Sequence, residues 1–272
     1  MKIILSGDDF GRSHEMNLAI DYAMRNGLIC STALLMGSEY TNEAVELAFS
    51  GEYVHNVHCH LNLAACISVG NHFVPLNEEY KKSRFCKNGE FANVRYYKPD
   101  FAKYSDVIFK ELETQFLTFV KLTNQQGNYS HVDFHLYLNF SPPVAVAYQK
   151  LIRKYHIKTA RFFGEHHRVC ERATSRKRRL IDSGLIFLMK RNKACVVKSS
   201  KIEYYLERQR EFERNNMIEL YVHPDYRDGI LIDKTNSVFG HDMKPLEEHI
   251  DLVKKSGNVE FISWSDLIVN EK

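Results

Sequence analysis

Residues 2–36 read KIILSGDDFGRSHEMNLAIDYAMRNGLICSTALLM, and this stretch decides the expected fold. The apolar run at Lys2–Ser6 predicts a short buried strand, and Ser13 is placed to cap a helix that ends at Asn26-Gly27. A second apolar run at Thr32–Met36 predicts the next strand. A strand, a helix and a strand in this order are typical of a mostly parallel sheet covered by helices.

The same alternation continues along the chain. Further strands are expected at Tyr53–His58 (running into His60), Tyr129–His135, Lys158–Phe162, Met217–His223 and Val259–Ile262. Further helices are expected at Asn42–Phe49, Asp106–Lys121, Pro143–Tyr155, Glu171–Arg191, Lys201–Arg214, Pro245–Lys255 and Ser265–Val269. About seven or eight strands alternating with helices favour an α/β fold, a TIM-like (β/α) barrel, over an open doubly wound sheet.

Residues 1–272 contain no visible linker or internal repeat, so one domain is expected. Residues 64–103 break the alternation, because they combine Gly, Pro, Asn and aromatic residues without a period. A loop of this length is usually functional or partly disordered, and we interpret it as a long insertion or loop over the site.

The composition narrows the class of protein. With 44% hydrophobic and 26% charged residues the chain has an ordinary globular composition, and a net charge of +3 does not argue for nucleic acid. Its 6 cysteines are irregularly spaced without a CxxC pair, which indicates reduced thiols. The apolar start is too short for a signal peptide, and no run approaches the roughly 18 residues of a membrane helix. A cytoplasmic protein is therefore expected.

Acidic and histidine side chains recur where the predicted strands end. They are Asp8-Asp9, His58-Cys59-His60, the alternating set His131, Asp133 and His135, and His223-Pro224-Asp225. In a barrel of this type the reactive groups gather at the carboxyl ends of the strands. One Asp with two His is a common ligand set for a divalent metal ion, and a second carboxylate can act as the base for water. The pattern therefore predicts a metal-dependent hydrolase.

Side-chain alternation narrows the choice of histidines. His60 and His135 lie furthest toward the strand ends and are expected to reach a metal ion. His58 and His131 are more typical of packed or hydrogen-bonded core histidines. An Asp-Asp pair after a strand is, on its own, equally typical of a turn or a helix cap. The combination of strand ends, and not a single residue, predicts the site.

Four blocks of sequence carry a resemblance to a known family. They are SGDDFGRSHEMNLAIDYAMRNGLICSTALLM at 6–36, HCHLNL at 58–63, SHVDFHLYLNFSPPV at 130–144 and LYVHPDY at 220–226. In these blocks the chain resembles the YdjC-like carbohydrate deacetylases, which include the chitooligosaccharide deacetylases. The blocks are spread over most of the chain, and the first is the most specific.

The resemblance implies a distorted (β/α) barrel that uses a divalent metal ion to hydrolyse the N-acetyl group of a sugar, releasing acetate. Carried onto the matching positions, Asp9, His60 and His135 would be the metal ligands. Asp8 would be the general base that activates water, and His223 the general acid. Zinc suits the ligand set best, with magnesium as the alternative. The resemblance also implies a homodimer.

Three further residues are expected beside these groups. Asp133 would orient a ligand or catalytic histidine. Asn62 would contact the substrate or support the ligands. Arg161 would bind a sugar hydroxyl or an anionic group, or else form a surface salt bridge.

The chain departs from the family pattern at two places. Residues 136–139 read LYLN where the family shows further histidines, and Asp225 replaces a glycine after Pro224. These departures concern the sugar pocket, so the identity of the sugar is left open. The alternatives are a metal-dependent amidase or deacylase acting on a non-sugar substrate, and a carbohydrate-binding protein that has lost catalysis.

Two basic runs, RATSRKRRL at 172–180 and KRNKACVVK at 190–198, leave one further alternative. Most such runs are solvated helix faces, but basic runs also mark sites that bind an anionic surface. A basic helix at 172–191 would contact an anionic or lipid-linked glycan, or the membrane surface that carries it. No nucleic-acid motif accompanies it.

Overall fold

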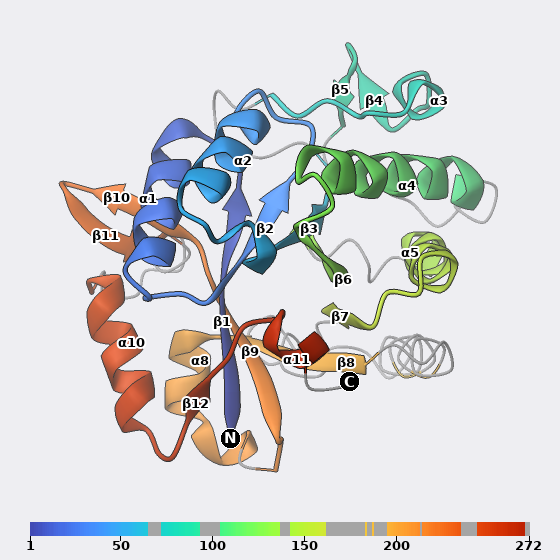
Figure 1. The fold of residues 1–272 in the computed structure, drawn as a ribbon. Helices are drawn as coiled ribbons and strands as arrows, with labels where there is room; N and C mark the ends of the chain where they lie inside the picture. The colour runs from blue at the N-terminus through green and yellow to red at the C-terminus, as the bar shows by residue number, and fades with distance from the viewer. Residues whose placement is uncertain are drawn as a thin grey trace.

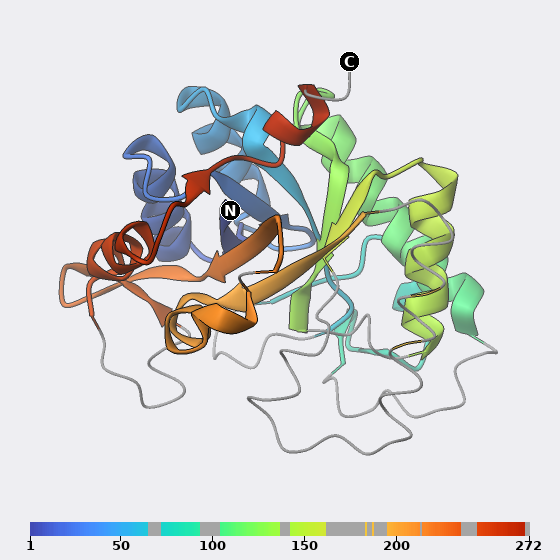
Figure 2. The ribbon, with the colours of Figure 1, turned by 90° about the horizontal axis from the view of Figure 1, so that it is seen from below.

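The computed structural model describes residues 1–64, 72–92, 104–136, 142–161, 183, 187, 195–212, 214–234 and 244–269. Within these ranges parallel strands form a closed barrel (Figures 1 and 2). In order around the barrel they are β1 (Lys2–Phe10), β2 (Ser31–Leu35), β3 (Val57–Leu61), β6 (Asn128–Phe134), β7 (Thr159–Arg161), β8 (Cys195–Lys201) and β9 (Met217–Val222). The predicted α/β barrel is confirmed.

Strand β1 closes the barrel and also causes its distortion. It pairs with β9 from Lys2, opposite Met217, to Gly7, opposite Val222. On its other edge, the first residues of β1 pair with the short strand β12 (Glu260–Phe261), and β2 pairs only from Ser6 onward. The edge of β1 is therefore shared between two strands.

Helices surround the barrel on the outside (Figures 1 and 2). They are α1 (His14–Arg25), α2 (Thr41–Ser50), α4 (Ser105–Leu122), α5 (Pro142–Lys154), α8 (Ile202–Glu207), α10 (Leu246–Lys255) and α11 (Asp266–Val269), with 3-10 turns at Val54–Asn56 and Gln209–Glu211. Helix α1 begins as predicted, because the Ser13 side chain accepts a hydrogen bond from Met16 N. Within the described ranges, no helix is both long and apolar enough to cross a membrane.

In the described part of the chain, two small hairpins lie outside the barrel (Figure 1). One consists of β4 (Cys86–Lys87) and β5 (Glu90–Phe91) and follows α3 (Glu78–Lys81). It belongs to the stretch that we interpreted as a loop, and its chain is tied to α4, since Glu111 accepts hydrogen bonds from Leu76 N and Asn77 N. The other hairpin pairs β10 (Pro224–Arg227) with β11 (Ile230–Asp233), beside α1.

Several predicted boundaries are wrong. The strand expected from Tyr53 starts at Val57, because a 3-10 turn precedes it. The helix expected over Lys201–Arg214 is only α8, and the preceding residues Cys195–Lys201 form the unpredicted strand β8. Strand β8 is paired on both edges, with β7 and β9, so tertiary pairing outweighs its basic composition. The basic helix expected at 171–191 lies outside the described residues, apart from positions 183 and 187.

Alternation along β1 separates the apolar core from the polar interior. Ile3 and Leu5 pack in the main hydrophobic cluster with residues of α1, whereas Ile4 belongs to a smaller cluster with Val197 and Trp264. Fully burying an aliphatic side chain stabilises the fold by about 1.5–3 kcal/mol. Further along β1, the interior is lined by buried carboxylates, histidines and an arginine.

Candidate functional site

Asp8 and Asp9 lie inside β1, at a break in its regular pleat. The register between β1 and β2 shifts between Gly7 and Phe10, and Asp9 has a φ of 69°. Successive side chains of a regular strand point to opposite faces, so two adjacent carboxylates would not share one face. The positive φ, which Asp tolerates better than most residues, turns both carboxylates toward the same interior. Both are almost fully buried.

Asp9, His60 and His135 converge at the carboxyl ends of three strands. Asp9 Oδ1 lies 2.9 Å from His135 Nδ1 and 3.5 Å from His60 Nε2. One ligand atom of each residue lies within 4.8 Å of those of the other two. The two imidazole rings are 5.4 Å apart and nearly perpendicular. The expected ligand residues are thus brought together, with His60 in β3 and His135 directly after β6.

A second layer of hydrogen bonds orients this group. His60 Nδ1 lies 2.5 Å from Asp133 Oδ1, so the ring turns its Nε2 toward Asp9. Asp133 Oδ2 also contacts His58 Nε2 at 3.2 Å. Arg12 Nη1 donates to Asp9 Oδ2 at 2.6 Å, which leaves Oδ1 facing the two rings. A carboxylate behind a ligating imidazole is the usual arrangement in metal sites.

Arg161 lies at the centre of the buried charges. Its guanidinium donates to both oxygens of Asp8 at 2.5 and 2.9 Å, and to both oxygens of Glu219 at 2.7 and 2.5 Å. It also lies 2.9 Å from Asp133 Oδ2. Because Arg161 is fully buried, the surface salt bridge that we held open for it is excluded. The residue instead holds the relative positions of three carboxylates.

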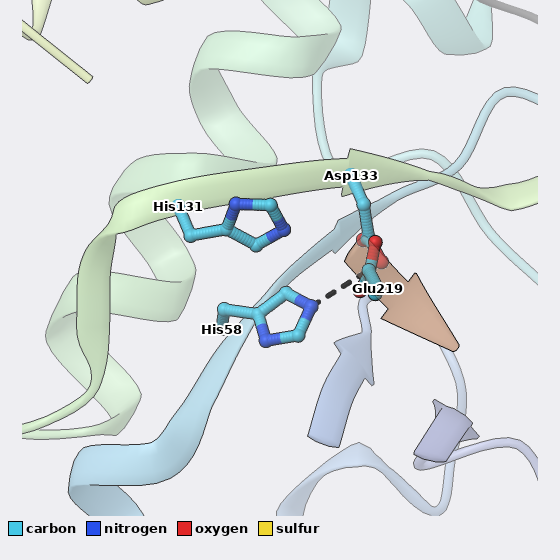
Figure 3. Close-up of side chains that lie close together, drawn as sticks. All are labelled: His58, His131, Asp133 and Glu219. Atoms are coloured by element: carbon cyan, nitrogen blue, oxygen red, sulfur yellow. Dashed lines mark hydrogen bonds and ion pairs between the residues drawn. The ribbon is translucent and has the colours of Figure 1, made fainter. Parts of the chain in front are cut away.

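Among the residues that the structure describes, two other groups of potential ligands overlap with these contacts. One is His58, His131, Asp133 and Glu219, drawn in Figure 3. Both of its carboxylates are already bound to a cation, the Arg161 guanidinium. The His131 ring is stacked on Trp264 at 3.6 Å, and its Nδ1 lies 2.9 Å from Thr159 Oγ1.

The remaining group, Asp8 with His60 and Asp133, meets the same objection, since Arg161 binds both of its carboxylates. Arg12 binds only the second oxygen of Asp9, so the first still faces His60 and His135. Among the described clusters, Asp9, His60 and His135 therefore fit a metal ion best.

The charge balance also fits a divalent cation. The linked carboxylates of Asp8, Asp9, Asp133 and Glu219 face the guanidinium groups of Arg12 and Arg161. If all are ionised, this set of described residues carries two excess negative charges. Buried charges need neutralisation, which a divalent ion would supply.

The pKa shifts of these groups follow from burial and from their charged neighbours. Burial lowers the pKa of His60, but Asp133 and Asp9 outweigh burial and raise it to about 10, so the ring holds a proton when no metal ion replaces it. Burial would raise the pKa of Asp9, yet His135 and Arg12 hold it well below its ordinary value. Burial raises the pKa of Asp8 and exceeds the opposing effect of Arg161.

His223 follows β9, and the hairpin β10–β11 places an acid beside it. Pro224 pairs with Asp233, whose Oδ1 accepts a hydrogen bond from His223 N at 3.0 Å and lies 3.9 Å from the ring Nδ1. Burial lowers the pKa of His223 to about 4, while Asp9 and Asp233 act in the opposite direction. The ring is therefore neutral near pH 7 in the absence of substrate.

Asn62 comes directly after β3 and is fully buried. Its Oδ1 accepts a hydrogen bond from Ala64 N at 2.9 Å. Its main chain is held by Gln115 of α4 through Asn62 N and O, at 2.9 and 2.6 Å. The residue therefore has a fixed position two residues beyond His60.

Sequence reasoning missed three residues of this network. Glu219 precedes Tyr221 by two residues and His223 by four. Strand alternation would therefore have placed Glu219 on the same face as His223. Asp233 is brought in by the Asp228-Gly229 turn, where both φ values are positive, a strong hairpin signal. Arg12 gives no signal beyond standing three residues after Asp9.

Comparison with known proteins adds to this geometry. A family described as "YdjC-like protein" matches residues 2–251. Carbohydrate deacetylase 2 of Listeria innocua is 25% identical over 150 residues, which is 55% of this chain and 56% of the relative. The carbohydrate deacetylase of Vibrio parahaemolyticus is 26% identical over 157 residues, which is 58% and 57% of the two chains. The chain thus spans somewhat more than half the length of these curated relatives.

The fold has a structural counterpart over nearly its whole length. A crystal structure from Enterococcus faecalis V583, described as that of a candidate cellobiose-phosphate cleavage protein, superposes with a TM-score of 0.69 and covers 98% of each chain. The sequence identity is 17%, so the likeness concerns the fold alone.

Proposed function

Because the chain belongs to the YdjC-like protein family, we propose that it is a metal-dependent hydrolase that removes the N-acetyl group from an N-acetylated sugar or glycan and releases acetate. The observation that carries this proposal is the convergence of Asp9, His60 and His135, with Asp8 beside them, at one end of the barrel. The relatives named carbohydrate deacetylases support the substrate class.

Asp9, His60 and His135 would hold one divalent ion, zinc or magnesium. Such an ion would act as a Lewis acid toward water and toward the substrate carbonyl. The chain's contribution is to fix the ligands: Asp133 holds His60 through Nδ1, and Arg12 holds Asp9 through Oδ2. Each contact aims the remaining ligand atom at the same point.

Asp8 would be the general base that removes a proton from the attacking water. Its burial and raised pKa bring its proton affinity closer to neutrality, where a general base is most effective. The two hydrogen bonds from Arg161 prevent the carboxylate from rotating. The water oxygen bonds to the carbonyl carbon, the carbon–nitrogen bond breaks, and acetate leaves.

His223 would donate the proton that the departing sugar amine needs. With a pKa of about 4 the free ring is neutral at pH 7, so substrate binding has to raise its proton affinity. Asp9 and Asp233 already act in this direction, and negative charge developing on the substrate oxygen adds to it. Asp233 would keep the ring oriented.

The partners remain proposals of the same kind. The substrate would be an N-acetylated sugar, free, anionic or lipid-linked, and the protein would act in the cytoplasm as a homodimer. The proposed contact of residues 172–191 with a membrane surface lies outside the described residues. Acetate release from a panel of N-acetylated mono- and oligosaccharides, with and without chelator, tests the function. Acetate release from other N-acyl amides, and none from sugars, would favour the alternative amidase.

A further inference from the structure

Asn62 carries an unused hydrogen-bond donor in a fully buried position. Its Oδ1 is occupied by Ala64 N, whereas Nδ2 has no partner among the described residues. Burying an amide donor without an acceptor is unfavourable, and native proteins rarely leave one so. A ligand at this end of the barrel would supply the missing acceptor.

The main chain fixes which way this side chain faces. The Gln115 amide binds both N and O of Asn62, as a neighbouring strand would, and Gln115 is itself held by Glu111 at 2.7 Å. Asn62 therefore extends β3, and alternation places its side chain on the same face as that of His60.

The strand register then locates Asn62 relative to the metal ligands. His60 pairs with Asp133, and Leu61 with Phe134, and Asn62 and His135 are the residues that directly follow these two neighbouring strands. The unused donor thus lies at the end of the barrel where Asp9, His60 and His135 converge.

We propose that Asn62 Nδ2 donates a hydrogen bond to the carbonyl oxygen of the substrate's acetyl group. The inference rests on the proposed function and adds a catalytic residue to it. An amide nitrogen only donates, so its partner has to be an acceptor oxygen. The carbonyl oxygen gains negative charge as water attacks, and a donor fixed in advance stabilises that state more than the ground state.

Asn128 offers a matched control at the other end of the barrel. It begins β6, its Oδ1 accepts a hydrogen bond from Ser130 N at 3.0 Å, and its Nδ2 is also buried without a partner among the described residues. Asn62→Ala and Asn128→Ala therefore remove the same local hydrogen bond and the same free donor. They differ in their place in the barrel, because Asn62 follows β3 at the end where the proposed ligands converge and Asn128 begins β6.

The test compares both variants with the metal-loaded wild-type protein on an N-acetylated disaccharide and on p-nitrophenyl acetate, an ester without sugar hydroxyls. We expect Asn62→Ala to lose about 10²–10³-fold in kcat on both substrates, the scale for one oxyanion donor. Asn128→Ala should stay near wild type, while metal content and thermal unfolding shift alike in both variants.

Two results would overturn the inference. One is equal activity of the two variants, and the other is a loss confined to KM or to the disaccharide, which would place a sugar hydroxyl at Asn62. Asn62→Asp keeps the Oδ1 acceptor and removes the donors, so it serves if Asn62→Ala does not fold. Turnover by wild type and Asn128→Ala tests the proposed function separately.

Discussion

Asp8 and Asp9 are adjacent in the chain, yet both carboxylates face the barrel interior, because Asp9 has a φ of 69° and the β1–β2 register shifts beside it. The break gives the two residues different partners. Asp9 meets His60 and His135, and Asp8 meets Arg161. One irregularity in a strand thus separates a proposed ligand from a proposed base.

The separation of roles predicts the effect of Asp8→Asn. The amide keeps the size of the side chain but cannot take a proton from water. We expect turnover to fall by about two orders of magnitude or more, the usual scale for a lost general base. Metal content, measured on the same preparation, should be unchanged. Wild-type turnover in Asp8→Asn would show that another group is the base.

Arg161 should contribute much more to stability than an exposed arginine. Arg161→Met would leave the carboxylates of Asp8, Asp133 and Glu219 buried without their cation. We expect a loss of about 3–5 kcal/mol in the free energy of unfolding. Arg208→Met, which removes an exposed pair with Glu211, should cost less than about 1 kcal/mol. Urea unfolding in the presence of chelator compares the two, and equal losses would contradict the account.

His131 should make the fold sensitive to acid. Burial and the neighbouring His58 hold its pKa well below the ordinary 6.5. As the pH falls through 6.5, the unfolded chain binds a proton that the folded chain refuses, so stability present above pH 6.5 is lost toward lower pH. His131 contributes at most about 1.4 kcal/mol per pH unit to the slope of the free energy of unfolding against pH.

His131→Phe keeps an aromatic ring to stack on Trp264 and removes the titrating group. We therefore expect the variant to lose less stability than wild type between pH 7 and pH 5, whatever its stability at pH 7. Urea midpoints at several pH values, with chelator present, measure the difference. If the urea midpoints of the variant and of wild type changed in parallel with pH, His131 would not be the source of the acid sensitivity.

The proposed role of His223 as proton donor can be tested by changing the leaving group of the substrate. A sugar amine needs a proton to depart, whereas p-nitrophenolate does not. We expect His223→Gln to lose about two orders of magnitude or more on an N-acetylated sugar, and much less on p-nitrophenyl acetate. Equal losses on both substrates would point to a role in binding or positioning instead of proton donation.

Most of the barrel was predictable because its strands and helices have clear periods. Asp8, His60, His135 and His223 were selected by one rule, that barrel chemistry gathers at the carboxyl ends of strands. The rule does not depend on exact boundaries, so the convergence of His60 and His135 was predictable although the strand at His60 starts later than expected.

The charge network was less predictable, because it depends on distances across the barrel. Arg161 stands at the end of a three-residue strand, and nothing local distinguishes a buried arginine with three carboxylates from an exposed one. Strand β8 was missed because its basic flanks resemble a solvated helix, while its pairing with β7 and β9 comes from distant segments. The Asp228-Gly229 turn was a local signal that the sequence reasoning overlooked.

The central claim is that Asp9, His60 and His135 form the metal centre, and metal binding tests it most directly. Zinc or magnesium titrated into metal-free protein should bind at one equivalent. His135→Ala should weaken binding by more than about 100-fold, since even supporting residues contribute about 10–100-fold. His131 belongs to the group whose two carboxylates are already paired with Arg161, so His131→Phe should bind the metal ion as wild type does. Undiminished binding by His135→Ala, or a loss in His131→Phe alone, would contradict the account.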